Sequence, residues 1–517
     1  MTFEIVFVLL SLLGMMAALI ADEMRPGMVL FSVVVLFLCA GILTPKEMLE
    51  GFSNKGMITV ALLFLVSEGI RQSGTLGQVI KKLLPQGKTT VFKAQLRILP
   101  SVAFISAFLN NTPVVVIFAP IIKHWAKSVK LPATKFLIPL SYVTILGGIC
   151  TLIGTSTNLV VHGMILEAGY EGFTMFELGK VGIFIAIAGI IYLFIFSKRL
   201  LPDARPDTAV PDEEVEEGEK LHRVEAVLGA RFPGINKKLS DFNFQRHYGA
   251  EVKEIKTRNG QRYVDHLEDV VLREGDTLVV MADDTFIPTW GESSVFVLLT
   301  NGNDPDTSGK KKRWLALILL VLMIVGATVG ELPATKEMFP DIKLDMFFFV
   351  CITTIIMAWT NIFPARKYTK YISWDILITI ACAFAISKAM VNSGVADCVA
   401  GFIIGLSDDY GPHVLLAILF VITNLFTELI TNNAAAALAF PLALSISAQL
   451  GVSPTPFFVV ICMAASASFS TPIGYQTNLI VQGIGNYKFT DFVRIGLPLN
   501  IITFLISVIL IPLIWNF

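Results

Sequence analysis

The chain has 517 residues, of which only 16% are charged, and its mean hydropathy is +0.70. A soluble domain carries about 25% charged residues, so this composition excludes a chain whose whole surface faces water. The formal net charge of -1 gives no reason to expect nucleic acid as a partner. The scattered cysteines have neither metal-ligand spacing nor the pattern of a disulfide framework.

Apolar runs recur along the chain, and a bilayer span needs about 20 such residues. They occupy residues 3–20, 27–43, 56–70, 94–122, 134–165, 179–197, 314–332, 345–363, 373–391, 412–446, 456–484 and 492–515. The first run is followed by ADEMRPG, without a basic leader or a small-residue cleavage site, so we expect a retained span and not a signal peptide. These runs predict a polytopic α-helical membrane protein.

The composition changes in the middle of the chain. Residues 201–220 are rich in proline and acidic residues and are predicted to be a solvated linker. Residues 221–286 contain the strand-like runs HRVEAVL, AEVKEIKT and TLVVMADD and a turn signal at Asn259-Gly260, which together predict a small α/β soluble domain. Residues 287–313 are expected to be a second linker that leads back to the membrane.

The membrane parts before and after this domain repeat each other. The segment LNNTPVVVIFAP (109–120) matches ITNNAAAALAFP (430–441), and GTSTNLVVHG (154–163) matches GYQTNLIVQG (474–483). Ser67 and Gly74 match Ser387 and Gly394 in the same order. The chain therefore divides into a first half, 1–200, and a second half, 314–517. Tandem membrane repeats of this kind are typical of secondary transporters.

The basic residues predict the orientation of the two halves. Residues 94–122 have basic clusters at both ends, whereas residues 412–446 have none. Because basic residues favour the cytoplasmic side, we expect these segments to enter the membrane from opposite sides. The prediction is an inverted-topology repeat with two re-entrant helical hairpins, a cytoplasmic α/β domain inserted between the repeats, both termini outside and an inner-membrane location. The exceptions are Lys46, Lys55, Lys336 and Lys343.

Polar motifs interrupt the apolar runs at matched places. Asn110–Pro113 and Thr431–Asn433 should be the tips of the hairpins, and residues 154–158 and 474–478 should break the following spans. Helix N-termini at such breaks present free N–H groups to an anion, and the exposed oxygens suit a cation such as sodium. No basic side chain lies in these motifs. The alternatives are polar contacts between helices and simple helix kinks.

These motifs, in this order, resemble the divalent anion:sodium symporter family, whose signature is a Ser-Asn-Thr tip on each of two oppositely entering hairpins. The resemblance implies a homodimer with an elevator motion. It places one sodium ion at Ser106, Asn110, Asn111 and Gly154, and another at Thr427, Thr431, Asn432 and Gly474. The residues expected to face the substrate are Asn111, Thr112, Thr155, Asn432, Asn433, Gly474 and Tyr475.

The sequence departs from the family pattern at the tips and in the second loop. The tips are Asn-Asn-Thr and Thr-Asn-Asn, and Tyr475-Gln476 stands where dicarboxylate carriers tend to have Thr-Pro. A tyrosine should make the pocket smaller, which favours a small tetrahedral anion, sulfate first. The inserted domain resembles the C-terminal half of RCK (regulator of potassium conductance) domains, which dimerise and in some cases bind a small regulatory ligand.

The expected function is therefore sodium-coupled symport of a divalent anion, with no cofactor besides sodium as the coupling ion. One alternative is a carrier of di- or tricarboxylates. Another is a proton-coupled antiporter, in which Glu428 would carry the proton; hydrogen bonding of Glu428 at the hairpin is the preferred interpretation. A cation channel lacks support because no TVGYG-like filter is present, and no nucleophile–base pair or metal triad indicates an enzyme.

Overall fold

The computed structural model describes residues 3–21, 23–85, 87–203, 222–229, 232–257, 261–283, 286, 290, 295–300, 310–339, 342–405 and 411–517. Most of the predicted linker 201–220 and the predicted turn at Asn259-Gly260 lie outside these residues. Within them, eight helices are long and apolar enough to cross a membrane. The prediction of a polytopic helical membrane protein agrees with this architecture.

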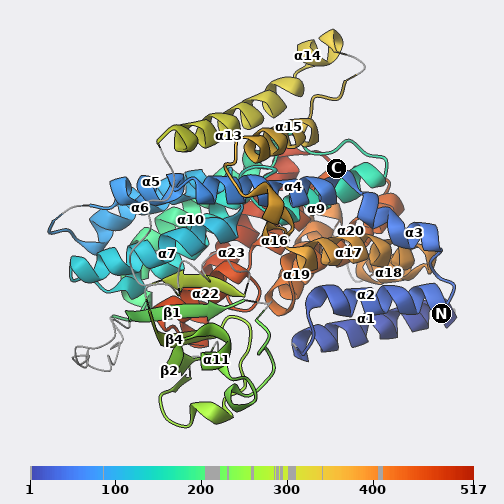
Figure 1. Cartoon of the computed structure of the whole chain (residues 1–517). Helices are drawn as coiled ribbons and strands as arrows, with labels where there is room; N and C mark the ends of the chain where they lie inside the picture. Colours follow the sequence, from blue (N-terminus) through green and yellow to red (C-terminus); the bar gives the residue numbers. More distant parts are fainter. Residues whose placement is uncertain are drawn as a thin grey trace, which may run out of the picture.

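The helices of the first half follow the predicted apolar runs (Figure 1). They are α1 (Phe3–Ala21), α2 (Pro26–Cys39), α3 (Pro45–Glu50), α4 (Lys55–Gln72), α5 (Thr75–Leu83), α6 (Val91–Ser106), α7 (Asn111–Ser128), α8 (Leu137–Gly148), α9 (Ser156–Glu167) and α10 (Gly179–Leu200).

The second half has the same order of long elements. Its helices are α13 (Lys310–Gly330), α14 (Pro333–Met338), α15 (Met346–Trp359), α16 (Tyr368–Tyr371), α17 (Trp374–Asn392), α18 (Val395–Gly405), α19 (Gly411–Leu429), α20 (Asn432–Leu450), α21 (Thr455–Ser466), α22 (Gln476–Gly485) and α23 (Phe489–Ile514). The matched glycines Gly74 and Gly394 have φ values of +72° and +75°, so each ends its helix in the left-handed conformation that glycine adopts without strain.

Small residues let the central helices approach closely. A β-carbon on Gly147 of α8 would lie 2.1 Å from the Ala103 carbonyl oxygen of α6, and the alanines at the start of α20 are buried. Large apolar side chains are exposed instead on the outer helices, such as Phe184, Ile187 and Ile191 on α10. An outer surface of this kind suits lipid, which agrees with the bilayer as a partner.

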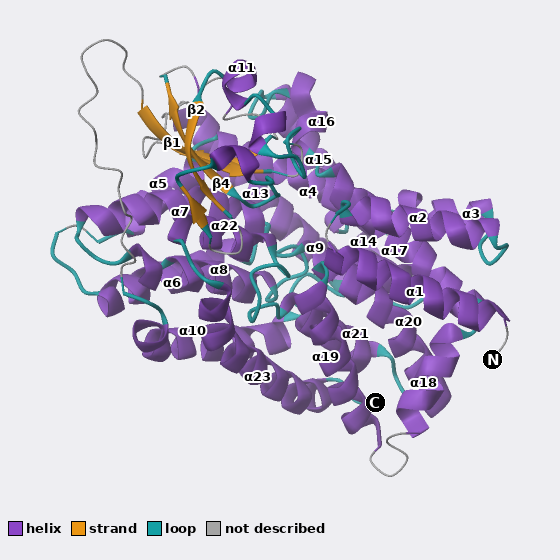
Figure 2. Ribbon diagram, turned by 90° about the horizontal axis from the view of Figure 1, so that it is seen from below, coloured by secondary structure: helices purple, strands orange, loops and turns teal. Residues whose placement is uncertain are grey.

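The inserted domain is a five-stranded sheet in the order β3-β2-β4-β1-β5, with antiparallel pairing. The strands are β1 (His222–Leu228), β2 (Glu251–Lys256), β3 (Arg262–Tyr263), β4 (Thr277–Ala282) and β5 (Phe296–Thr300), with the short helix α11 (Phe244–Tyr248) beside them. Phe232, Phe244 and Phe296 contribute to its separate aromatic core. Figures 1 and 2 both place this sheet beside α7 and α22.

The predicted boundaries of this domain are wrong at its C-terminal end. Strand β5 lies within residues 287–313, which were expected to be a linker, and it pairs with β1. Helix α13 likewise begins at Lys310, before the predicted start of the second half at 314. The apolar run 295–299 is preceded in sequence by Gly291, Ser293 and Ser294 and followed by Asn301-Gly302, so the sequence carries a strand signal that the predicted boundary at 286 left out.

Candidate functional site

Each half of the protein contains a short non-helical tip between two helices. In the first half α6 ends at Ser106 and α7 begins at Asn111; in the second half α19 ends at Leu429 and α20 begins at Asn432. The non-helical tips, 107–110 and 430–431, therefore lie N-terminal to the predicted tips, 110–112 and 431–433, because Asn111 and Asn432 already form the first turns of α7 and α20. Whether the two helix pairs re-enter the membrane stays a prediction.

The two tips carry the same side-chain contact. Ser106 Oγ lies 2.8 Å from Asn111 Oδ1, and Thr427 Oγ1 donates to Asn432 Oδ1 at 2.8 Å. In both tips the partners are separated by five residues, and all four side chains are buried. The structure thus brings together the first and third members of each set of predicted sodium ligands.

The loops that follow α8 and α21 are also equivalent. They span residues 149–155 and 467–475, and each ends where the next helix begins, at Ser156 and at Gln476. The predicted breaks at 154–158 and 474–478 therefore extend into the first turns of α9 and α22. In each loop an asparagine amide donates to the carbonyl of a threonine seven residues earlier: Asn158 to Thr151 at 2.9 Å, and Asn478 to Thr471 at 3.2 Å.

The same threonines tie each loop to the tip of its own half. Thr151 Oγ1 donates to the Ala107 carbonyl oxygen, and Thr471 Oγ1 donates to the Glu428 carbonyl oxygen at 3.1 Å. The loop glycines are required by close contacts: a β-carbon on Gly154 would lie 2.5 Å from the Gly148 carbonyl oxygen. The sequence repeat is therefore also a repeat of hydrogen bonds.

Oxygen atoms gather around the side chain of Asn111. One terminal atom of its amide lies 2.8 Å from Ser106 Oγ, 3.0 Å from the Thr144 carbonyl oxygen and 3.2 Å from the Gly154 carbonyl oxygen. Two of these neighbours accept hydrogen bonds and cannot donate them, so either the amide turns its NH₂ group toward them or a cation lies among the oxygens. Thr144 was not predicted, because its contribution is a main-chain carbonyl that any residue would supply.

The second cluster is built around Thr427. Its hydroxyl oxygen contacts Asn432 Oδ1 and lies 2.6 Å from the Ala465 carbonyl oxygen; its single proton is donated to one of these two acceptors at a time. A β-carbon on Gly474 would lie 2.4 Å from the Thr427 carbonyl oxygen, so Gly474 packs directly against this cluster. Hard cations prefer oxygen ligands of this type.

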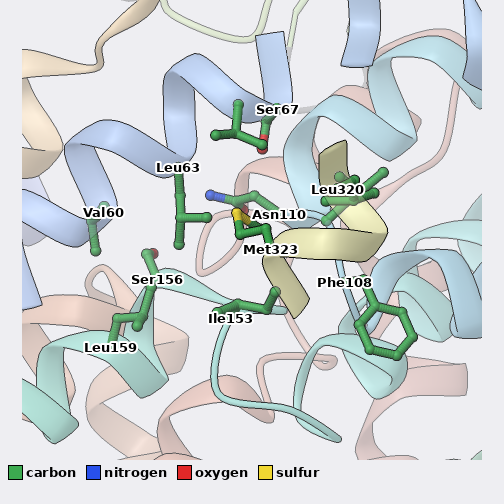
Figure 3. Close-up of a pocket in the computed structure, with 12 residues that line it drawn as sticks. Val60, Leu63, Ser67, Phe108, Asn110, Ile153, Ser156, Leu159, Leu320 and Met323 are labelled. Carbon is green, nitrogen blue, oxygen red and sulfur yellow. The ribbon is translucent and has the colours of Figure 1, made fainter. Parts of the chain in front are cut away.

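Two of the predicted sodium ligands lie elsewhere. Thr431 caps α20, since its hydroxyl accepts from the Ala434 N–H at 3.4 Å. Asn110 caps α7 without a side-chain bond and lines a separate small pocket with Ser67 and Ser156 (Figure 3). Its side chain is therefore not part of the cluster around Asn111.

Tyr475 connects the two halves at the centre of the site. It is 9% exposed, and its hydroxyl contacts Asn111 and lies 3.1 Å from Thr155 Oγ1. The hydroxyl also interacts with Asn432 of the second tip. Tyr475 thus lies between Asn111 and Asn432, and its effect on the size of the pocket stays a prediction.

Further contacts cross between the halves in reciprocal pairs. Thr112 Oγ1 of the first tip lies 3.4 Å from Gln476 Oε1, and Ser156 Oγ lies 3.3 Å from Asn433 Oδ1 of the second tip. The first turn of α7 therefore faces the first turn of α22, and the first turn of α20 faces the first turn of α9. We call the region where α7, α9, α20 and α22 begin the junction of the tips. All residues predicted to face the substrate lie in this region.

Glu428 anchors the second loop. Its carboxylate oxygens accept from the Ser470 N–H at 2.8 Å, the Thr471 N–H at 2.9 Å and Asn500 Nδ2 at 2.7 Å. Glu428 forms hydrogen bonds, as the preferred interpretation expects, but the partners of its carboxylate lie in the second loop and on α23 and not within the second hairpin. Asn500 was not predicted; its signal is an asparagine within the apolar run 492–515.

The positive electrostatic features of the site come from the main chain. The helices α7, α9, α20 and α22 all begin at it, and their N-termini carry partial positive charge. The groups at the junction are otherwise amides and hydroxyls. The arrangement combines two oxygen clusters that suit cations with helix N-termini that suit an anion.

The citrate transporter family model matches the chain in two overlapping segments, residues 15–443 and 338–517. The chain belongs to the citrate transporter family. Membership indicates a membrane transporter and not an enzyme, in agreement with the helices long enough to cross a membrane.

Named relatives agree with this family. An uncharacterized transporter of Synechocystis is 29% identical over 94% of this chain and 93% of its own length. Sodium/sulfate cotransporter 2 of Chlamydomonas reinhardtii is 30% identical over 54% of this chain and 31% of its own. The sodium-dependent dicarboxylate transporter SdcS of Staphylococcus saprophyticus is 25% identical over 28% of each chain.

Proposed function

We propose that this member of the citrate transporter family is a sodium-coupled symporter of a small divalent anion, sulfate first. The observation that carries the proposal is the pair of oxygen clusters, around Asn111 and around Thr427, on either side of Tyr475. Sodium ions at these clusters would supply the positive charge that the side chains of the junction do not. An anion held next to them explains why sodium and substrate would be carried together.

The anion would bind at the N-termini of the tip helices. Free N–H groups at the start of α7 and α20, together with the hydroxyls of Thr112 and Thr155, are the neutral donors that an oxyanion requires. Tyr475 limits the length of an anion that fits between the tips, which favours sulfate over a dicarboxylate. The name of the Chlamydomonas relative supports the same substrate class.

Three features taken from the family resemblance belong to this proposal. The chain would work as a homodimer, it would carry its substrate by an elevator motion of the site across the membrane, and its inserted domain would be of the RCK C-terminal type in the cytoplasm.

Radiolabelled sulfate uptake into proteoliposomes tests the proposal. Uptake is compared under an inward sodium gradient, under a matched potassium gradient and with succinate as competitor. Sodium-dependent sulfate uptake that excess succinate leaves unchanged is the expected result. Sodium-dependent succinate uptake in its place would assign the dicarboxylate alternative, which the Staphylococcus relative favours. Sulfate uptake independent of sodium would refute the coupling.

A further inference from the structure

Two equivalent glycines on α9 and α22 contact different partners. A β-carbon on Gly163 of α9 would lie 2.5 Å from the side-chain oxygen of Asn54, which caps the start of α4. The equivalent Gly483 of α22 faces the inserted domain instead, where a β-carbon would lie 2.5 Å from Thr277 Oγ1. In the second half, the inserted domain therefore occupies the place that the start of α4 takes in the first half.

The residue one turn earlier on each helix repeats this relation. The Leu159 carbonyl oxygen of α9 lies against Gly56 of α4, within 2.7 Å of where its β-carbon would be. Leu479 of α22 is in van der Waals contact with Gly275, 3.7 Å from the β-carbon position of this residue. Gly275 has a φ of +85°, so a tight turn of the inserted domain makes the contact.

The pockets beside these two contacts differ in size. The pocket beside Leu159, between α4, α9 and the start of α15, is about 1160 Å³. The pocket beside Leu479 is about 220 Å³. Its walls include Thr112 and Gln476 from the junction of the tips, residues 227–229 and 274–275 from the inserted domain, and residues 370–373. The inserted domain thus forms one wall of the pocket that Thr112 and Gln476 also line.

Other contacts fix the inserted domain across both halves. Glu225 of β1 accepts an ion pair from Lys123 of α7 at 3.0 Å, and Lys256 lies 3.4 Å from the same carboxylate. Asn236 donates to the Glu23 carbonyl oxygen, just after α1, at 3.0 Å. The domain thus contacts α7, α22 and the segment after α1, and Figures 1 and 2 show it beside α7 and α22. These contacts connect the inserted domain to the first half through α7 and Glu23 and to the second half through α22.

Where the inserted domain contacts α22, some buried polar atoms of the described residues lack hydrogen-bond partners. Thr277 Oγ1 is buried without a hydrogen-bond partner among the described residues, and so are both polar atoms of the side chain of Gln482, the neighbour of Gly483. Buried polar groups without partners destabilise the state that contains them and regain hydrogen bonds when water reaches them. Undocking would hydrate Thr277, which makes the docked state reversible.

We propose that the inserted domain is a removable plug, formed by residues 274–277 seated on Leu479 and Gly483. It closes the opening beside Thr112 and Gln476 and must leave α22 before an anion can pass on this side. This inference rests on the proposed function in treating the junction of the tips as the transport site.

Disulfide trapping tests the plug. A β-carbon on Gly483 would lie 3.8 Å from Thr277 Cβ, close to the mean of about 3.8 Å in disulfides. The double variant Thr277→Cys, Gly483→Cys is made with the exposed Cys39 replaced by serine. Oxidation is expected to form the crosslink and to stop sodium-driven sulfate uptake, and a reductant is expected to restore it. The plug is refuted if the crosslink does not form, or if the crosslinked protein transports like the reduced one.

A second pair of variants loosens the contact. Gly483→Ala is expected to displace Thr277 and to increase labelling of Leu479→Cys by a water-soluble maleimide about fivefold, which corresponds to ~1 kcal/mol. Adding Thr277→Ala removes the opposing hydroxyl and should restore the slow labelling. Unchanged labelling in Gly483→Ala would overturn the plug. Absence of sulfate uptake in the wild type would instead overturn the proposed function, and labelling would still decide the plug.

Discussion

Replacing Glu428 with glutamine distinguishes an anchor of the second loop from a proton carrier. The carboxylate accepts from three donors within 3 Å: the Ser470 N–H, the Thr471 N–H and Asn500 Nδ2. Glutamine has only one acceptor oxygen. If that oxygen keeps the Ser470 and Asn500 bonds, its NH₂ group faces the Thr471 N–H, which is 2.9 Å from the present acceptor.

The expected cost follows from these bonds. A hydrogen bond to a charged group contributes about 1.5–3 kcal/mol, and a buried donor left unpaired costs about 1–3 kcal/mol. We therefore expect Glu428→Gln to lower the free energy of unfolding by ~2–4 kcal/mol. Uptake should fall but persist, because the loop loosens while the proposed sodium ligands of both tips remain.

The assay combines denaturant unfolding in detergent with sulfate uptake. Glu68→Gln is the matched control, since Glu68 also lies within a membrane helix but pairs with Arg71 at 2.6 Å near the helix end. That ion pair is partly exposed, so the control should lose less than about 1 kcal/mol. Wild-type stability of Glu428→Gln together with complete loss of uptake would refute the anchor and favour proton coupling.

Three further substitutions test the site. Gly474→Ala should abolish sodium-dependent uptake, because its β-carbon would lie 2.1 Å from Ser468 Oγ and 2.4 Å from the Thr427 carbonyl oxygen; normal uptake would contradict this packing. Thr427→Ala should raise the half-saturating sodium concentration roughly tenfold, equal to ~1.4 kcal/mol, whereas Thr427→Ser should remain near wild type in the same titration. Tyr475→Thr should allow succinate to compete with sulfate; a competition curve identical to wild type would show that Tyr475 does not limit anion size.

The membrane helices could be predicted from the sequence because the bilayer imposes their length and apolar character. Every predicted apolar run contains a helix or a pair of helices. The polar tips could also be located, since asparagine and threonine are poor residues for the interior of a helix and stand out in the middle of an apolar run. The exact position of each turn could not be predicted, because an asparagine such as Asn111 or Asn432 can lie either in a tip or in the first turn of a helix. The contacts of Ser106 with Asn111 and of Thr427 with Asn432 determine which of the two is formed.

The parts of the site that sequence did not reveal depend on atoms common to all residues or on tertiary placement. The Thr144 and Ala465 carbonyl oxygens belong to the main chain, so no residue type marks them. Thr431 and Asn110 are predicted sodium ligands; the structure places the Thr431 side chain at the cap of α20 and Asn110 at a neighbouring pocket, and their binding of sodium stays a prediction. The position of the inserted domain against α22 could not be predicted, because Gly483 matches Gly163 in sequence while their partners differ.

The matching hydrogen bonds of the two halves supply an internal control for any study of coupling. Thr151 is equivalent to Thr471, and Asn158 is equivalent to Asn478. Identical changes made in either half would therefore disturb one cluster while the other serves as reference within the same molecule. The two halves differ where Ala107 corresponds to Glu428, so among the described residues a carboxylate holds the loop of the second half and none holds that of the first. If both proposed sodium sites exist, they should accordingly fill in a fixed order, with the more rigid second site binding before the first.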